Sequence, residues 1–437
     1  MPEADPPLAE NCQRCGSLRL RSVQAAAFPN FRGGTSLSTT EVGTKCACPE
    51  RSRRVRTNSR ILHYFTEDIF VSDILCYMKC VLFIVDAPGP AEFIAPVIPL
   101  LKGELEIHLL SVKSSPTEIL QQHNPTRCDT ERDAQRYYTE LKPEVLVTGM
   151  SSLLLGPFVV RRLTELAERD HVPILCFQDY WANHRHPQNK PIMRAWNTLL
   201  VPDELAKQLV LADGFKNNLI VTGNPAFEKF RNVNVGASRL QLRRELGVNK
   251  NRFVILYAGT GTPQSAEADE RTFQFLSAGV RMLRREMPDL IYIARAHPRD
   301  EHPTRYKELA PDLKLLNTDG FSLADDLLPL ADVVVSMYST NLIHACFLRI
   351  PAVSILLREA GTARLRAVGL SDFPPNTVGA TVGIHEPSFD LLLSALRRIR
   401  DDSMYRNELA KNQEAYFPFH KDSATVRVAE AIRSFIA

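Results

Sequence analysis

The chain lacks a long apolar segment and a strong charge of either sign. Its 437 residues include 53 Lys and Arg against 50 Asp and Glu, which gives a formal net charge of +3. A balance this close to neutral gives no reason to expect nucleic-acid binding. The longest apolar candidate, 61–77, is interrupted by charged residues and falls short of the ~20 apolar residues of a membrane-spanning helix. We expect no transmembrane segment, while peripheral contact with a membrane stays open.

The sequence also lacks a targeting segment and a clear metal motif. Glu3 and Asp5 make the N-terminus unlike a secretory or mitochondrial leader, so we expect a cytoplasmic protein. The nine cysteines are an odd number, and the pairs Cys12-x-x-Cys15 and Cys46-x-Cys48 suggest a zinc site at first sight. The second spacing is unusually tight and no histidine lies nearby. We therefore expect no metal.

Residues 1–77 do not have the pattern of a folded domain. They combine Pro and Gly dipeptides with a Ser/Thr-rich stretch at 35–44 and an Arg-rich run at 51–60, without sustained apolar periodicity. This composition predicts a disordered, solvated tail. Because a buried strand follows Met78 directly, we expect the natural start of the folded protein close to Met78. Two alternatives stay open for residues 1–77, a disordered tail or a segment outside the true reading frame.

After Met78, strand-like and helical patterns alternate in two sets. The first set has strand-like runs at 79–85, 106–110, 145–148, 174–177, 198–201 and 219–222. The second set has strand-like runs at 253–257, 290–294, 313–316, 333–336 and 352–356. Helical patterns occur at 159–169, 238–246, 388–401 and 425–436. Such alternation predicts parallel sheets with helices on both faces. The expected fold class is α/β, with two Rossmann-like domains that face a cleft.

The polar segment 230–251 is the expected connection between the two domains. This places an N-terminal domain at 78–229 and a C-terminal domain at 230–437. We expect the last helix to pack back on the N-terminal domain.

The segment 332–356 carries the strongest functional signal. It has the pattern of a strand, a small polar turn, a short helix and a second strand. Ser339, Thr340 and Asn341 open the helix, where free N–H groups and the helix dipole favour an anion. This predicts a site for a phosphorylated ligand, such as a nucleotide. Two alternatives stay open, since the hydroxyls can cap the helix and His344 can be a buried packing residue.

A second small-residue turn follows the first strand of the second set. It contains Gly259, Thr260, Gly261 and Thr262. Small residues at a strand end let backbone N–H groups surround a phosphate. We expect phosphate binding here, although a lone Gly-x-Gly is weak evidence by itself.

The strand at 290–294 is followed by a basic turn. His297 at this position can donate to phosphate or act as an acid or base near neutral pH. Arg295 and Arg299 offer positive charge to a diphosphate. The alternative is a surface histidine between solvated arginines.

Two candidates lie in the first domain. Gly89, after the opening strand, allows close approach of a ligand, and Glu92 opens the next helix. Asp179 follows a buried strand in a polar and aromatic patch, where His184 or His186 can assist it. Asp179 is the best-placed carboxylate of this domain for a general base. Glu92 is the second candidate.

Several segments, in this order, resemble the GT-B superfamily of nucleotide-sugar enzymes, and most of all the non-hydrolysing UDP-N-acetylglucosamine 2-epimerases. The likeness covers residues 79–434. The segments that carry it are 89–98, 142–150, 221–225 with the sequence Val-Thr-Gly-Asn-Pro, 339–345 and 362–364. The resemblance implies a GT-B fold, a nucleotide-binding C-terminal domain, an acceptor-side N-terminal domain and a ligand contact from Arg364.

The chain departs from that family at its catalytic acids. Met150 stands where the family has Asp, and Phe177 and Asp179 stand where it has His and Glu. His344 and Ala363 replace two further Glu residues. Epimerisation at C2 needs positioned acids and bases, so their loss speaks against that reaction.

Three functions therefore remain at this stage. The leading hypothesis is a transferase that uses a nucleotide-activated sugar or polyol phosphate in cell-surface polysaccharide synthesis. It needs a UDP-type or CDP-type donor, a sugar or polyol acceptor and no cofactor, and it is compatible with a homodimer. In this hypothesis Asp179 or Glu92 is the base and His297 assists the leaving group. The alternatives are a divergent epimerase and a non-catalytic nucleotide-sugar-binding protein.

Overall fold

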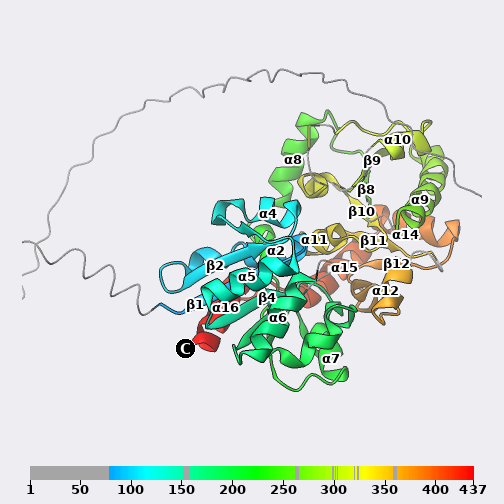
Figure 1. Cartoon of the computed structure of the whole chain (residues 1–437). Coiled ribbons are helices and arrows are strands. Elements are labelled where there is room, and N and C mark those ends of the chain that lie inside the picture. The colour runs from blue at the N-terminus through cyan, green and yellow to red at the C-terminus, as the bar shows by residue number, and fades with distance from the viewer. Residues whose placement is uncertain are drawn as a thin grey trace, which may run out of the picture. The chain divides into compact units, whose positions relative to one another are not determined.

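The computed structural model describes residues 78–150, 158–260, 265–297, 300, 302, 304–318, 320–321, 324–357 and 362–437 (Figure 1). The predicted tail lies outside these residues, and so do Gly261, Thr262 and Arg299 of the predicted site. Arg364 belongs to a described helix, but its side chain is not described. Within the described residues, no helix is both long and apolar enough to cross a membrane.

The first sheet has seven parallel strands in the order β3-β2-β1-β4-β5-β6-β7. Their bounds are β1 Cys80–Val85, β2 Glu106–Ser111, β3 Thr126–Arg127, β4 Val145–Gly149, β5 Ile174–Phe177, β6 Thr198–Val201 and β7 Asn218–Val221. The central strands are apolar runs that are buried on both faces, as expected for a parallel sheet. Because all strands run the same way, their carboxyl ends form one edge, where ligands bind in folds of this kind.

The helices of the first half connect these strands. They are α2 Pro88–Ile94, α3 Ile98–Leu101, α4 Ser114–Ile119, η1 Gln121–His123, α5 Glu131–Leu141, α6 Val159–Arg169, η2 Asn183–Arg185, η3 Lys190–Ala195, α7 Glu204–Ala212 and η4 Pro225–Phe230. The apolar stripe of α6 is typical: Leu163, Leu166 and Ala167 are buried, while its arginines face outward.

The second sheet has five parallel strands in the order β12-β11-β10-β8-β9. Their bounds are β8 Val254–Ala258, β9 Ile291–Arg295, β10 Val333–Ser336, β11 Ala352–Ile355 and β12 Val382–Ile384. The helices of this half are α8 Val235–Glu245, α9 Ala266–Glu286, α10 Arg305–Leu309, η6 Asp325–Leu330, α11 Thr340–Phe347, α12 Ala363–Ala367, α13 Pro374–Thr377, α14 Phe389–Asp401, α15 Ser403–Tyr416 and α16 Ala424–Ile436. Strand β8 pairs with both β9 and β10, so the loops that follow these three strands are neighbours.

The predicted α/β fold class with two parallel sheets is confirmed, and one predicted strand is wrong. At 313–316 only Leu315 makes an isolated bridge, to Tyr292. The segment lies beside the edge strand β9, and its apolar residues, such as Leu313, pack into the core without forming a ladder. The short strands β3 and β12 and the helix α15 were not predicted. The domain boundary near residue 230 stays a prediction.

The last helix, α16, packs against the first sheet. Its Val428, Ile432 and Ile436 belong to the same buried cluster as Phe83 and Phe93. On its surface, Arg433 forms an ion pair with Glu104 at 2.7 Å. The chain from α15 to α16 therefore runs along one edge of the first sheet, where it lines a cavity described below.

Candidate functional site

A cavity of about 190 Å³ lies among loops from both sheets. It is lined by Pro88, Gly89, Asp179, Tyr180, Trp181, Asn183, His186, Thr260, His297, Tyr338, Ser339, Thr340, Leu365 and Val368. We call it the first cavity. It brings together six of the predicted site residues, namely Gly89, Asp179, Thr260, His297, Ser339 and Thr340.

Asp179 is held at this cavity by its neighbours. Its Oδ1 accepts a hydrogen bond from Asn183 Nδ2 at 2.7 Å, and its backbone oxygen accepts one from Asn224 Nδ2 at 3.0 Å. Its Oδ2 lies against Gly89, where a built Cβ would overlap the carboxylate. Gly89 is therefore required for the close approach of its neighbour Asp179 as well as for access to the cavity.

The carboxyl of Asp179 has an altered acidity. Burial raises its pKa to about 6, and the negative charges of Glu92 and Asp86 act in the same direction. The hydrogen bond from Asn183 opposes this change without cancelling it. A carboxyl with a pKa close to neutral pH is suited to exchange a proton during a reaction.

The N-terminus of α11 forms another wall of the first cavity. Ser339 is the N-cap, and its hydroxyl oxygen accepts a hydrogen bond from Asn341 N at 3.3 Å. Thr340 is exposed, whereas Ser339 is buried. The expected capping and the expected ligand contact thus involve the same residues, since both use the first turn of the helix.

Asn341 and His344 face away from this cavity. Asn341 Nδ2 donates to Asp325 Oδ1 at 2.7 Å, and His344 Nδ1 lies 2.6 Å from the same oxygen. The ring of His344 also packs against Phe227 and Phe230. Burial alone would raise the pKa of Asp325, but its interactions with His344 and a lysine hold it below the usual range. This cluster fixes α11 against η4 and η6.

The turn after β8 is fixed from behind by Asp269. The Asp269 carboxylate accepts hydrogen bonds from Thr260 N and Thr260 Oγ1, each at 3.1 Å, and from the hydroxyl of Tyr257. Arg305 and Tyr306 are its other partners. Thr260 lines the first cavity and is held rigidly there.

Gly259 has a packing role in the structure. A Cβ at this position would overlap the hydroxyl of Tyr306, and the Gly259 N–H donates to the backbone oxygen of Arg295 at 2.9 Å. Gly259 does not line the first cavity. Its predicted contact with phosphate stays a prediction.

Two residues of the basic turn after β9, Arg295 and His297, have different surroundings. His297 is half-buried and lines the first cavity. The Arg295 guanidinium donates to the backbone oxygens of Thr318 and Phe321, and it does not line the cavity. Arg295 therefore holds the loop that follows β9, while His297 lines the cavity.

The other predicted helpers lie in different surroundings. Glu92 is exposed on α2 and does not line the first cavity. His184 is buried, and its Nε2 lies 2.7 Å from Asp213 Oδ2. Burial lowers the pKa of His184 despite that contact. Of the two histidines named beside Asp179, only His186 lines the cavity.

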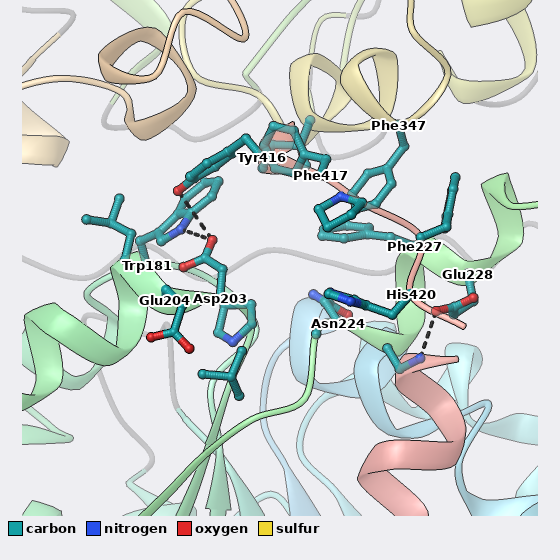
Figure 2. A pocket seen from close by; sticks show the side chains of 18 of the residues that line it. Trp181, Asp203, Glu204, Asn224, Phe227, Glu228, Phe347, Tyr416, Phe417 and His420 are labelled. Atoms are coloured by element: carbon teal, nitrogen blue, oxygen red, sulfur yellow. Dashed lines mark hydrogen bonds between the residues drawn. The ribbon is translucent and has the colours of Figure 1, made fainter. Parts of the chain in front are cut away.

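A second cavity, of about 460 Å³, shares residues 179–181 with the first (Figure 2). Its other lining residues are Pro202, Asp203, Glu204, Leu205, Val221, Gly223, Asn224, Phe227, Glu228, Ile343, Phe347, Ala415, Tyr416, Phe417, Pro418, Phe419, His420, Ala424 and Arg427. Sequence reasoning did not find this cavity. The aromatic run at 416–419 was a signal for it, but its neighbours in space are distant in the sequence.

One described group of side chains could hold a metal ion. It consists of Cys80, Glu106 and His108, whose ligand atoms lie within 4.8 Å of one another. Cys80 and Glu106 are the first residues of β1 and β2, so the group lies at the amino ends of the strands, away from the carboxyl ends that line the cavities. It is not part of either cavity.

The fold is similar to those of solved nucleotide-sugar enzymes. UDP-GlcNAc 2-epimerase from Neisseria meningitidis, bound to UDP-GlcNAc, is 15% identical with a TM-score of 0.57, covering 82% of this chain and 100% of that chain. The UDP-GlcNAc 2-epimerase from Methanocaldococcus jannaschii is 16% identical, with a TM-score of 0.59 and the same coverage of 82% and 100%. A glycosyltransferase from Rickettsia africae is 12% identical with a TM-score of 0.52, covering 82% of this chain and 98% of that chain. These likenesses confirm the expected GT-B fold.

The sequence itself points to a particular activity within that fold. No curated protein matches the chain. Residues 177–434 match the family described as CDP-Glycerol:Poly(glycerophosphate) glycerophosphotransferase. The match begins at the end of β5, two residues before Asp179, and extends into α16. The chain belongs to this glycerophosphotransferase family, which confirms the predicted transferase acting on a nucleotide-activated sugar or polyol phosphate.

Proposed function

We propose that the protein transfers a polyol phosphate from a CDP-activated polyol to an acceptor hydroxyl, with Asp179 as the general base. The observation that carries this proposal is the Asp179 carboxyl, whose pKa is raised to about 6 by burial, at the wall of the first cavity. Family membership supports the donor class.

The reaction is a substitution at phosphorus. The acceptor oxygen forms a bond to the phosphorus that carries the polyol, and the bond from that phosphorus to the bridging oxygen breaks. CMP leaves with the electron pair, and the hydroxyl proton passes to the Asp179 carboxylate. Such a reaction needs little covalent chemistry from the protein, because positioning and charge stabilisation supply most of the acceleration.

The wall of the cavity formed by the first turn of α11 suits the departing phosphate in this proposal. The first turn of α11, at Ser339 and Thr340, offers N–H groups and the positive end of the helix dipole. Thr260 and His297 also line this cavity, and in the proposed reaction Thr260 adds a hydroxyl group and His297 donates to the leaving oxygen. Phosphate contacts remain predictions at Gly261, Thr262, Arg299 and Arg364.

The test is an assay of product identity with separate donors. The purified chain is incubated with CDP-glycerol, CDP-ribitol or UDP-GlcNAc, each with a polyol phosphate acceptor, and the products are resolved by chromatography and mass spectrometry. We expect CMP together with an acceptor heavier by one polyol phosphate. Conversion of UDP-GlcNAc to its C2 epimer, without CMP release from either CDP-polyol, would contradict the proposal.

Two substitutions connect this assay to the site. Asp179→Asn should abolish most of the CMP release while the protein still binds the donor. Asp390→Asn is the matched control, because Asp390 is exposed in the first turn of α14 and lines neither cavity. Equal loss of activity in both variants would speak against Asp179 as the base.

A further inference from the structure

The second cavity lies on the other side of the loop that carries Asp179. It is lined by residues that follow β5, β6 and β7, at the carboxyl edge of the first sheet. This edge is where parallel sheets bind ligands. Since Asp179, Tyr180 and Trp181 line both cavities, a molecule in the second cavity lies next to the proposed base while the donor lies in the first.

One wall of this cavity is aromatic. Phe227 and Phe347 are in contact, with ring centroids 5.0 Å apart, and Phe417 lies 5.3 Å from Phe347. Tyr416 and Trp181 continue the wall, with their rings roughly parallel at 6.5 Å (Figure 2). Rigid aromatic faces of this kind contact the C–H groups of a sugar or polyol at a small cost in entropy.

Most acidic groups of the cavity are already neutralised or engaged. Asp203 accepts hydrogen bonds from Trp181 Nε1 at 2.6 Å and from Tyr416 at 3.4 Å, and burial raises its pKa. Glu228 is bound by Arg231 and by the backbone N–H of residue 424 at 2.7 Å, the first residue of α16. Glu204 is largely exposed, at 68%, and pairs with a lysine at 3.5 Å.

Arg427 is the cationic side chain on this wall: burial lowers its pKa, and the nearby charges of Glu228 and Asp422 oppose that change. Its Nε is buried and has no hydrogen-bond partner among the described residues. Its guanidinium lies against Gly223, whose φ of +80° and missing side chain leave the space for it. The pKa of the adjacent His420 is lowered by burial and by the charges of Arg427 and Arg231, which is consistent with a positive potential here.

We propose that the second cavity binds the acceptor and that Arg427 pairs with a phosphodiester of that acceptor. This inference rests on the proposed function, because it assumes that Asp179 activates the acceptor hydroxyl. The aromatic wall contacts the polyol or sugar units, and the guanidinium recognises the phosphate group one unit from the attacking hydroxyl. Arg427 is thus a specificity-determining residue that favours acceptors already carrying a polyol phosphate.

The test compares a charged with a neutral acceptor. Glycerophosphoglycerol carries the phosphodiester, and diglycerol is its uncharged counterpart. In Arg427→Gln we expect KM for glycerophosphoglycerol to rise about 10- to 100-fold. KM for CDP-glycerol and for diglycerol should stay unchanged. A similar change in KM for both acceptors, or no change for either, would overturn the inference.

Two further variants separate charge recognition from folding. Arg433→Gln is the matched control on the same helix, since Arg433 pairs with Glu104 outside the cavity. Arg427→Lys keeps the positive charge and should recover much of the affinity for glycerophosphoglycerol. The melting temperature of Arg427→Gln shows whether this variant is still folded. If it falls while that of Arg427→Lys does not, only the kinetics of Arg427→Lys are used to judge the inference. A preference between the two acceptors unlike that of the wild type would then overturn it.

The two proposals can fail separately. If the wild type releases no CMP from any CDP-polyol, the proposed function is wrong. Calorimetry of glycerophosphoglycerol then tests the cavity without turnover. Binding by the wild type and by Arg433→Gln, but not by Arg427→Gln, supports the anion site. Equal binding by all three, or by none, overturns it.

Discussion

The two halves of the molecule each place an aspartate near the ends of their central strands, and the two acids have opposite surroundings. Asp269, in the second half, is completely buried and accepts hydrogen bonds from Tyr257, Thr260 and Tyr306, with Arg305 as its counter-ion. In the first half, the carboxylate of Asp179 accepts a side-chain hydrogen bond only from Asn183 among the described residues, and it faces a cavity.

This difference separates a structural acid, Asp269, from the proposed base, Asp179. Donors on all sides stabilise the charge of Asp269 and fix the turn that carries Thr260. Asp179 lacks such donors, and burial consequently raises its pKa to about 6. An acid of the first kind holds the shape of a site, whereas one of the second kind can accept and return a proton.

The largest expected effect is on catalysis at Asp179. Asp179→Asn removes the proton acceptor while keeping the size of the side chain. We expect kcat for CMP release to fall about 10²- to 10⁴-fold, the usual contribution of a general base. Steady-state kinetics with a CDP-polyol and a saturating acceptor measure it. A residual kcat within about threefold of the wild type would be incompatible with the assigned role.

The same substitution at Asp269 should instead destabilise the fold. Asp269→Asn removes one of the two buried carboxylates that pair with Arg305, the other being Asp300, and keeps fewer of the hydrogen bonds to the turn. Breaking such a buried pair costs about 3–5 kcal/mol. Denaturant unfolding of the two Asn variants side by side measures it. If Asp269→Asn were as stable as the wild type, Asp269 would not have the structural role that distinguishes it from Asp179.

A smaller effect of opposite sign is expected on the stability of Asp179→Asn. The folded protein keeps the Asp179 proton up to a pH of about 6, whereas an ordinary aspartate ionises at 3.8, so stability is lost between these two pH values and the loss is complete above about pH 6. We expect Asp179→Asn to be more stable than the wild type by about 1–3 kcal/mol at pH 7.5. The gain should shrink as the pH falls below about 6 and vanish at about pH 3, where the carboxyl is mostly protonated in both states. Unfolding curves at the two pH values test it.

The smallest effect concerns the glycine beside the base. In Gly89→Ala the added Cβ displaces the Asp179 carboxylate, which is the mobile end of its side chain. We expect kcat to fall about tenfold, while the free energy of unfolding changes by less than about 1 kcal/mol. Gly103→Ala is an unsuitable control because of its φ of +89°. Gly236→Ala is suitable, because it has no positive φ and its Cβ would make only an ordinary contact, with Asn234 Oδ1 at 3.5 Å. If Gly89→Ala lost stability but kept the kcat of the wild type, the added Cβ would not displace the Asp179 carboxylate as expected.

The sequence was sufficient for most of the strands and for part of the site. Apolar runs of β-branched residues mark β4, β5 and β10, and the strand ends then predict Asp179, Thr260 and Ser339, because the carboxyl ends of parallel strands share one edge. Local pattern alone could not tell whether a polar residue faces the cavity or a neighbour. Asn341 and His344 have the right spacing but bind Asp325.

The second cavity could not be predicted from the sequence, for a different reason. Trp181, Phe227 and Phe347 meet Tyr416 and Arg427 only because the chain returns to the first sheet through α16. No local period or motif encodes that return. The pKa of Asp179 likewise depends on burial and on Glu92 and Asp86 across the fold, which residue type does not reveal.

The most direct test of the account is a titration of the Asp179 carboxyl itself. Carbon-13 NMR of the protein labelled at its aspartate carboxyl groups, compared between the wild type and Asp179→Asn, isolates this one signal. The account predicts a signal that is present only in the wild type and titrates at about pH 6. A signal that titrates near pH 4, like an ordinary exposed aspartate, would contradict the proposal that Asp179 is the base of the site.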